Sequence, residues 1–183
     1  MDWLQAGAPQ REFERFVADS ADQLLRTAYL MAGNLAEAED LVQETLLRVA
    51  RRWYRVRGMD HPAAYARRIL VNLAIDSARQ RGRRQGELVV PASAAVRDQA
   101  DRRAERDFGA VDAHAELLKA LGSLPVRQRT VLVLRYWEDL PESQVAAILG
   151  CPVGTVKSLA ARGLTRLREV MSAGGSGAPS LSQ

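Results

Sequence analysis

Apolar residues recur at spacings of three and four along most of the chain, which is the pattern of amphipathic helices packed against a core. In the first third of the sequence the pattern runs through three segments, interrupted at Gly33 and Asn34 and again at Gly58 and Pro62. In the middle segment the core side is formed by Leu41, Val42, Thr45, Leu46 and Val49. No stretch shows a sustained strand-like alternation of apolar and polar residues. The pattern predicts an all-α protein.

A second helical zone follows after residues 85–112, a segment with mixed charges and few large apolar side chains. Because an unstructured loop of this length is unusual inside a compact domain, we predict two small helical domains joined by a flexible linker. Their expected bounds are 1–84 and 113–171, and residues 172–183 have the Gly and Ser content of a flexible tail. In the second domain we expect large apolar residues to lie in the core, namely Leu132, Leu134 and Trp137.

The 183 residues carry 26 Lys and Arg against 22 Asp and Glu, and almost all of the cations are arginine, whose planar guanidinium suits phosphates and base edges. Cys151 is the only cysteine, which excludes an intramolecular disulfide and argues against a cysteine-based zinc site. We find no signal peptide and no apolar run of the ~18–20 residues that a membrane span needs. We expect a cytoplasmic protein that contacts no membrane and holds no metal or cofactor.

The segment VAAILGCPVGTVKSLAARGLTRLR, residues 145–168, has the spacing of two helices joined by a tight turn. Gly150 is suited to end the first helix with a left-handed cap, and Pro152 shapes the turn. We expect Thr155 to cap the second helix and Val156 to point into the core. These offsets match a helix-turn-helix, whose second helix enters the DNA major groove.

The second helix of this pair is basic, and its outer face would be formed by Lys157, Ser158, Arg162 and Arg166. Cationic side chains contact phosphates or guanine edges, and hydroxyl groups serve either role. The alternative is an ordinary amphipathic hairpin with a solvated basic face, but this alternative leaves the matching turn offsets unexplained. We interpret the segment as a DNA-reading unit.

The segment AEAEDLVQETLLRVARRW, residues 36–53, changes the sign of its charge partway, from acidic to basic. This order complements the helix dipole and would stabilise the helix by itself. Asp40, Gln43, Glu44 and Leu47 also fall on one stripe at helical spacing, as they would on a helix that docks against a basic partner helix. Periodicity alone favours neither interpretation.

Residues 63–84 form a basic segment in which six arginines are opposed only by Asp76. Asn72 lies one helical turn before Asp76, so that the two side chains share a face. A solubilising helix end is the common explanation of such a charge run. A second basic site upstream of a helix-turn-helix favours nucleic-acid binding in two parts instead.

Four motifs in this order resemble the extracytoplasmic-function, or group-four, sigma factors of the sigma-70 family, and especially the sigma-E-like proteins of actinobacteria. They are AEDLVQETLLRVARRW, PAAYARRILVNLAIDSARQ, LPVRQRTVLVLRYWEDL and GCPVGTVKSLAARGLTRLR. The resemblance implies a sigma2-like bundle and a sigma4-like helix-turn-helix domain. It implies two partners, which are core RNA polymerase, contacted at its clamp helices and flap, and promoter DNA. The resemblance also suggests an anti-sigma factor as a third partner.

The resemblance also assigns roles to individual residues. Core-polymerase binding falls on Asp40, Leu41, Gln43, Glu44 and Leu47. Contact with the melted minus-ten element falls on the RGMDHP loop and on Arg67, Arg68, Asn72, Asp76 and Arg79. Recognition of the minus-thirty-five element falls on Thr155, Lys157, Ser158, Arg162 and Arg166.

The chain departs from the family pattern at two places. Ser77 and Ala78 stand where many relatives carry tryptophans, which weakens stacking on bases there. Leu159 and Ala160 stand where many relatives carry an arginine and then a leucine, and Gly163 is expected to loosen the helix. Both departures reduce the number of side chains that are predicted to contact bases.

The predicted function is to direct core RNA polymerase to promoters, by binding and without bond chemistry, so that the protein is not an enzyme. His61 and His114 form no motif with Cys151, and the sequence has no phosphate-binding Gly-Lys-Ser/Thr loop. The alternative is a stand-alone helix-turn-helix regulator that binds duplex DNA without polymerase.

Overall fold

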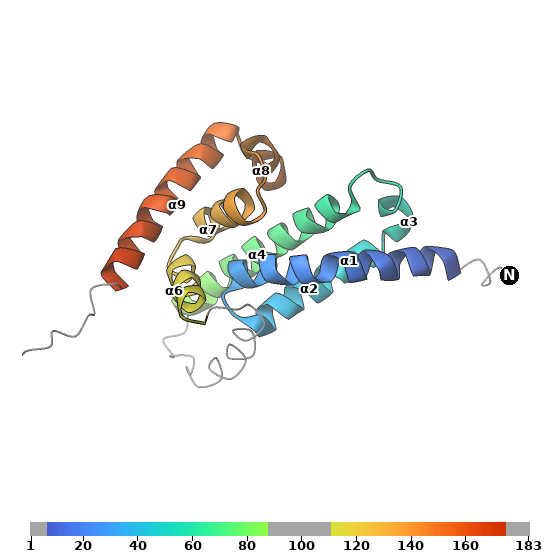
Figure 1. The fold of residues 1–183 in the computed structure, drawn as a ribbon, viewed down its shortest axis with the longest axis horizontal. Coiled ribbons are helices and arrows are strands. Elements are labelled where there is room, and N and C mark those ends of the chain that lie inside the picture. Colours follow the sequence, from blue (N-terminus) through green and yellow to red (C-terminus); the bar gives the residue numbers. More distant parts are fainter. Residues whose placement is uncertain (1–6, 88–110, 175–183) are drawn as a thin grey trace, which may run out of the picture. The chain divides into compact units, whose positions relative to one another are not determined.

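The computed structural model describes residues 7–87 and 111–174, and the chain divides into two compact units, before and after residue 93 (Figure 1). Every element in the described residues is helical, which confirms the predicted all-α class. Most of the predicted linker, 85–112, and of the predicted tail, 172–183, lies outside the described residues. The last helix of the first unit continues to Glu87, beyond the predicted domain end at Arg84.

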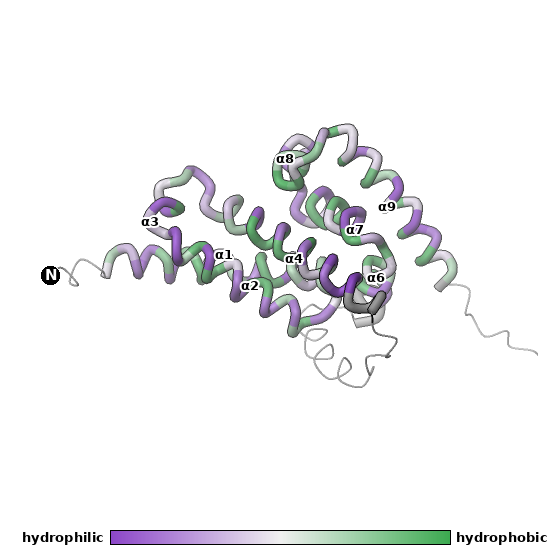
Figure 2. Tube along the Cα trace, turned by 180° about the vertical axis from the view of Figure 1, so that it is seen from behind, coloured by the Kyte–Doolittle hydropathy of each residue, from purple (hydrophilic) through white to green (hydrophobic). Residues whose placement is uncertain are grey.

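Unit 1 contains, in chain order, α1 (Gly7–Ala32), α2 (Leu35–Ala50), α3 (Trp53–Val56) and α4 (Pro62–Glu87). The three long helices lie side by side, and each packs against the other two (Figure 1). Val49 of α2 and Leu70 and Val71 of α4 are fully buried. Hydrophilic and hydrophobic residues are interleaved along the helices, as the spacing of three and four requires (Figure 2).

The turn between α1 and α2 is built as the sequence predicts. Gly33 adopts a left-handed conformation with a φ of 82°, and its N–H donates to the carbonyl oxygen of Tyr29 over 2.8 Å. Asn34 then caps α2, because its side-chain oxygen accepts a 2.9 Å hydrogen bond from the backbone N–H of Glu37. This cap fixes the direction in which α2 leaves the turn.

The short helix α3 is attached to the beginning of α1 through Trp53. The indole Nε1 of Trp53 donates to the carbonyl oxygen of Pro9 over 2.9 Å. Its ring lies 5.3 Å from the ring of Phe13 and 5.2 Å from the ring of Phe16, measured between centroids. These aromatic contacts hold α3 in place although it is only one turn long.

Unit 2 contains α6 (Val111–Gly122), α7 (Val126–Leu132), the π-helix η1 (Val133–Trp137), α8 (Glu142–Leu149) and α9 (Val153–Gly174). Its core runs along α7 and η1, where four consecutive residues from Val131 to Leu134 are buried. The long helix α9 packs against α6, α7 and α8. Leu132 and Leu134 therefore lie in the core, as predicted.

The prediction for Trp137 is wrong, because this side chain is 45% exposed. The cause is the π-helix, in which the N–H of Glu138 donates to the carbonyl oxygen of Val133, five residues earlier, over 3.1 Å. A π-turn holds more residues than an α-turn, so it rotates the following residues relative to the α-helical stripe. Trp137 is turned out of the core in this way.

The expectation that Gly163 loosens the second helix of the pair is also wrong. Gly163 is buried within α9, and a β carbon built at this position would lie 3.1 Å from Cδ1 of Leu132. The absence of a side chain lets α9 approach α7 closely. Gly163 is therefore a packing position in the core of unit 2.

The described helices and side chains bear on the expectations about membrane and metal. None of their helices is by itself long and apolar enough to cross a membrane, and α8 and α9 pass that test only as a pair bent by 102°. The described residues also hold no group of three or more His, Cys, Asp and Glu side chains that could bind a metal ion.

Candidate nucleic-acid interface

The turn of the helix-turn-helix has the predicted geometry. Gly150 ends α8 in the left-handed region, with φ 59° and ψ 42°, and the N–H of Cys151 donates to the carbonyl oxygen of Ala146 over 3.1 Å. Val145 of α8 and Val156 of α9 are fully buried and hold the two helices together. The left-handed cap at Gly150 and the core position of Val156 that were predicted for this motif are thus confirmed.

The expected cap at Thr155 is not found. The helix α9 begins at Val153, and the N–H of Thr155 already donates to the carbonyl oxygen of Pro152 over 2.9 Å. Thr155 is half-buried in the first turn, where Ser158 Oγ donates to its carbonyl oxygen over 3.0 Å. The chain turns directly from Pro152 into the helix, so Thr155 lies past the cap position.

The outer face of α9 is formed by the side chains that the sequence assigned to it. Lys157, Ser158, Arg162 and Arg166 are all exposed. Arg162 is oriented by a 3.2 Å hydrogen bond from its Nε to the carbonyl oxygen of Ser158. Lys157 Nζ lies 3.7 Å from a carboxylate oxygen of Glu142 on α8, a separation that leaves the ammonium accessible to a phosphate.

The two residues of α9 that depart from the family pattern, Leu159 and Ala160, do not belong to this exposed face. Ala160 is buried, and Leu159 is half-buried. Side chains that pack against the unit cannot reach base edges. The exposed cations and hydroxyl of α9 therefore make up the surface that is available to DNA on this helix.

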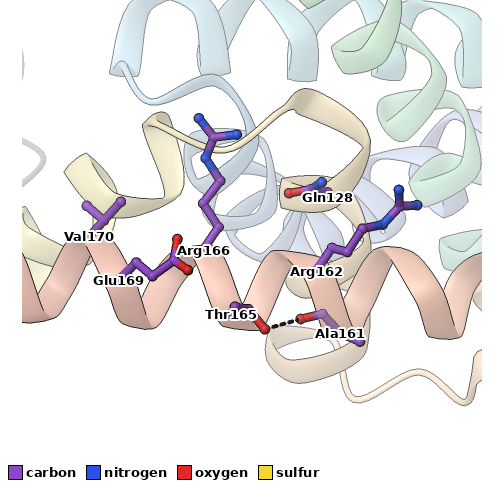
Figure 3. Close-up of a pocket in the computed structure, with 7 residues that line it drawn as sticks. All are labelled: Gln128, Ala161, Arg162, Thr165, Arg166, Glu169 and Val170. Carbon is purple, nitrogen blue, oxygen red and sulfur yellow. Dashed lines mark hydrogen bonds between the residues drawn. The ribbon is translucent and has the colours of Figure 1, made fainter.

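A groove runs along α9 beside the beginning of α7 (Figure 3). Arg162 and Arg166 project from α9 toward the side on which Gln128 of α7 lies, and Glu169 and Val170 continue the groove toward the end of the helix (Figure 3). The side-chain oxygen of Gln128 is buried and has no hydrogen-bond partner in the described structure. The groove thus places two guanidinium groups beside a glutamine whose oxygen is buried.

In unit 1, α2 presents most of the predicted docking stripe on its surface. Asp40 and Gln43 are exposed, and Leu47 is 52% exposed. Glu44 forms a 2.7 Å ion pair with Arg48 on the same helix. Leu41 does not belong to this surface: it is only 7% exposed, because it lies on the opposite, core-facing side of α2.

The basic set on α4 is also at the surface. Arg68, Asn72, Asp76 and Arg79 are exposed, and Arg67 is half-buried. Asp76 and Arg79 lie 3.7 Å apart, from carboxylate oxygen to guanidinium nitrogen. The residues of the RGMDHP loop from position 57 to position 61 are exposed where the chain enters α4. The loop and the helix together offer a mixed basic and amide surface.

Sequence reasoning missed a polar cluster between α2 and α4 that is centred on Glu37. The carboxylate of Glu37 accepts hydrogen bonds from Asn34 Nδ2 over 3.2 Å and from Ser77 Oγ over 2.9 Å, and it forms an ion pair with Arg81. Its side chain is only 17% exposed. The pattern of charges along α2 identified Glu37 only as an acid that favours the helix dipole, because its partners on α4, Ser77 and Arg81, lie some 40 residues away in the sequence.

The chain matches two family models, described as Sigma-70 region 2 over residues 16–84 and Sigma-70, region 4 over residues 114–167. It is 35% identical over 158 residues to an RNA polymerase sigma-E factor of Streptomyces avermitilis, a match that covers 86% of this chain and 84% of the relative. It is 34% identical over 173 residues to the ECF RNA polymerase sigma factor SigE of Mycolicibacterium smegmatis, covering 91% of this chain and 63% of that protein.

Two solved structures are similar in fold. The sigma factor RpoE of Bartonella quintana, crystallised in complex with the anti-sigma factor NepR, has a TM-score of 0.66 and 26% identity, and the match covers 88% of this chain and 98% of that one. CnrH, in complex with the cytosolic domain of CnrY, has a TM-score of 0.60 and 23% identity, with 92% of each chain covered. The matched regions, their order and the helix-turn-helix lead to one conclusion: the chain belongs to the extracytoplasmic-function group of the sigma-70 family of RNA polymerase sigma factors.

Proposed function

We propose that this sigma factor directs promoter-specific transcription with a division of labour between its units. Unit 1 binds core RNA polymerase through α2 and contacts the opened minus-ten strand through α4 and the preceding loop. Unit 2 reads the minus-thirty-five duplex through α9. The observation that carries the proposal is the basic outer face of α9, held by a turn with helix-turn-helix geometry.

The proposed docking surface on α2 consists of Asp40, Gln43, Glu44 and Leu47. An exposed leucine between carboxylates and an amide supports contact with a partner helix that is basic and partly apolar, as we expect of the polymerase clamp helices. Leu41 supports this surface from the core and makes no contact of its own.

The proposed mechanism is binding alone, so the protein is not an enzyme. Lysine and arginine contacts to phosphates supply a salt-dependent affinity, and a few side chains supply the choice of sequence. Strand opening is driven by the capture of unstacked bases in unit 1, since extruding a base from a duplex costs a few kcal/mol. Two weak promoter contacts add together once both units are held on one polymerase. We place this activity in the cytoplasm.

An anti-sigma protein is a further proposed partner. The Bartonella RpoE structure, which covers 88% of this chain, was determined in complex with such a protein. An antagonist that covers the α2 docking stripe or the face of α9 would block polymerase or promoter binding directly.

In vitro transcription with purified core RNA polymerase and fragments of a genomic library tests the proposal. We expect the full chain to add promoter-specific transcripts that core polymerase alone does not make. Binding of the free chain to the same promoter fragments is measured in parallel. Tight duplex binding without polymerase, together with no new transcript, would instead identify a stand-alone helix-turn-helix regulator.

A further inference from the structure

An aromatic ring on α3 has no role in the packing of unit 1. Trp53 and Val56 turn their side chains into the core, whereas Tyr54, between them on the helix, is 82% exposed. Among the described residues of unit 1 it is the one aromatic side chain that is exposed rather than buried or half-buried. A tyrosine that is exposed to this extent contributes little to the core, so its ring is available to bind a partner.

Arg57 covers part of this ring and is itself held in place. Its guanidinium carbon lies 5.3 Å from the centroid of the Tyr54 ring, a cation–π geometry. The same guanidinium donates to a carboxylate oxygen of Glu12 on α1 over 3.2 Å. The N–H of Arg57 also donates to the carbonyl oxygen of Trp53 over 2.9 Å. The pair is therefore oriented before any ligand arrives, which lowers the entropy lost on binding.

The sequence around Tyr54 is rich in arginine. Arg51, Arg52 and Arg55 are exposed on either side of it in the sequence. Arg52 reaches the first turn of α4, where its guanidinium donates to the hydroxyl of Tyr65 over 3.3 Å. This contact joins the residue before α3 to the first turn of α4. Only the loop of residues 57–61 separates α3 from α4 in the sequence, and the proposed minus-ten surface consists of that loop and of residues on α4 that begin with Arg67 and Arg68.

We propose that Tyr54 and Arg57 form a stacking platform for one unpaired base of the opened promoter strand. The free part of the Tyr54 ring stacks on the base, Arg57 supports the ring, and the neighbouring arginines attract the phosphates on either side. The platform extends the proposed minus-ten contact of unit 1, on which it rests. Stacking of this kind tolerates any base, so the platform adds affinity for single strand rather than sequence choice.

The competing occupant of this surface is a protein side chain, because tyrosine and arginine are also common at the centres of protein interfaces. A protein partner would have to supply carboxylates to balance Arg51, Arg52 and Arg55, which are exposed near Tyr54 in the sequence, because the carboxylate of Glu12 is engaged by Arg57. A nucleic-acid strand supplies a phosphate at every nucleotide. A polyanion with flat bases fits this surface better than a protein does.

The test uses the holoenzyme on a promoter obtained from the transcription assay, prepared with its minus-ten region already unpaired. We expect Tyr54→Ala to weaken binding to this template about 5- to 150-fold, the range for removal of a base-stacking aromatic, and Tyr54→Phe to retain the wild-type affinity. Tyr136→Ala is the matched control, because Tyr136 is an exposed tyrosine with Arg135 over its ring, 5.9 Å away, in unit 2. This control should leave the affinity unchanged.

A scan of abasic sites locates the stacked base. Each nucleotide of the unpaired strand is replaced in turn by an abasic one. Where the abasic site removes the base that stacks on Tyr54, wild type and Tyr54→Ala should bind with equal affinity, and at every other position Tyr54→Ala should still bind more weakly. Equal affinities of wild type and Tyr54→Ala would overturn the platform while leaving the sigma function intact. A Tyr54→Ala loss that appears in core-polymerase binding without DNA would also overturn it, in favour of a protein contact. Failure of the wild-type protein to direct any transcript would instead refute the proposed function.

Discussion

Replacing Glu37 by alanine should destabilise unit 1 far more than the removal of a surface charge normally does. The carboxylate connects the beginning of α2 to the second half of α4 through Ser77 and Arg81. Glu39, two residues further along α2, is an exposed carboxylate near the same helix end and serves as the control. Glu39→Ala removes the same charge and the same number of atoms without disturbing the contact between α2 and α4.

The contacts give the expected size of the effect. The 2.9 Å hydrogen bond from Ser77 to a carboxylate that is only 17% exposed contributes about 1.5 kcal/mol. The Arg81 side chain is 37% exposed, so solvent screening limits its ion pair to about 0.5 kcal/mol. The bond from Asn34, within the helix cap, adds roughly 0.5 kcal/mol. Alanine favours helix by about 0.4 kcal/mol over glutamate, which leaves a loss of about 2 kcal/mol.

Urea unfolding of the full chain measures this loss. Trp53 is buried in unit 1, and Phe substitutions at Trp3 and Trp137 make its fluorescence a reporter of that unit. With a urea dependence of roughly 1 kcal/mol per molar, as for small proteins, Glu37→Ala should lower the unfolding midpoint by about 2 M. Glu39→Ala should lower it by less than about 0.5 M, as surface substitutions do. Equal midpoints for the two variants would refute the inference that Glu37 joins the helices.

Three further predictions concern packing, docking and DNA. Gly163→Ala should lower the free energy of unfolding of unit 2 by about 1–3 kcal/mol relative to Gly154→Ala, as measured by urea titration. The new β carbon at position 163 would lie 3.1 Å from a buried leucine, whereas a β carbon at position 154 would have no atom within 4 Å. Equal unfolding midpoints for the two variants would contradict this prediction. Glu44→Lys should weaken core-polymerase binding about tenfold or more, whereas Asp22→Lys on α1 should not, and equal affinities would count against the α2 stripe. Lys157→Ala should reduce the slope of log affinity against log salt by about 1 on promoter duplex, and an unchanged slope would exclude a phosphate contact.

The helix-turn-helix was predictable because its rules are local. Gly150 is suited to the left-handed cap since it has no β carbon, and the structure places it there with a φ of 59°. Val145 and Val156 are buried at the offsets that the motif requires. Helix periodicity likewise identified the core of α2, including Val42, Thr45 and Val49. In each case the neighbours that decide the structure lie within a few residues.

The errors arose where the backbone or a distant helix changes the outcome. The exposure of Trp137 depends on a π-turn, which the spacing of apolar residues does not reveal. Gly163 is a weak position in an isolated helix but a contact point once α7 lies against it. Leu41 is assigned to the core by its spacing and to the polymerase-binding surface by the family resemblance, and its burial agrees with the spacing.

The Glu37 cluster also changes how the basic segment of α4 should be interpreted. Counted along the sequence, residues 63–84 carry six arginines against one acid, which suggests a strong field for attracting phosphates. In the folded unit, Arg81 is paired with Glu37 of another helix, and Arg79 lies near Asp76. Two of the six arginines therefore have a carboxylate nearby, so the field of this segment is weaker than the count along the sequence suggests. The proposed contact between α4 and the minus-ten strand would then depend on fewer guanidinium groups than the sequence count suggests, because an arginine that is paired within the unit gains less from a phosphate.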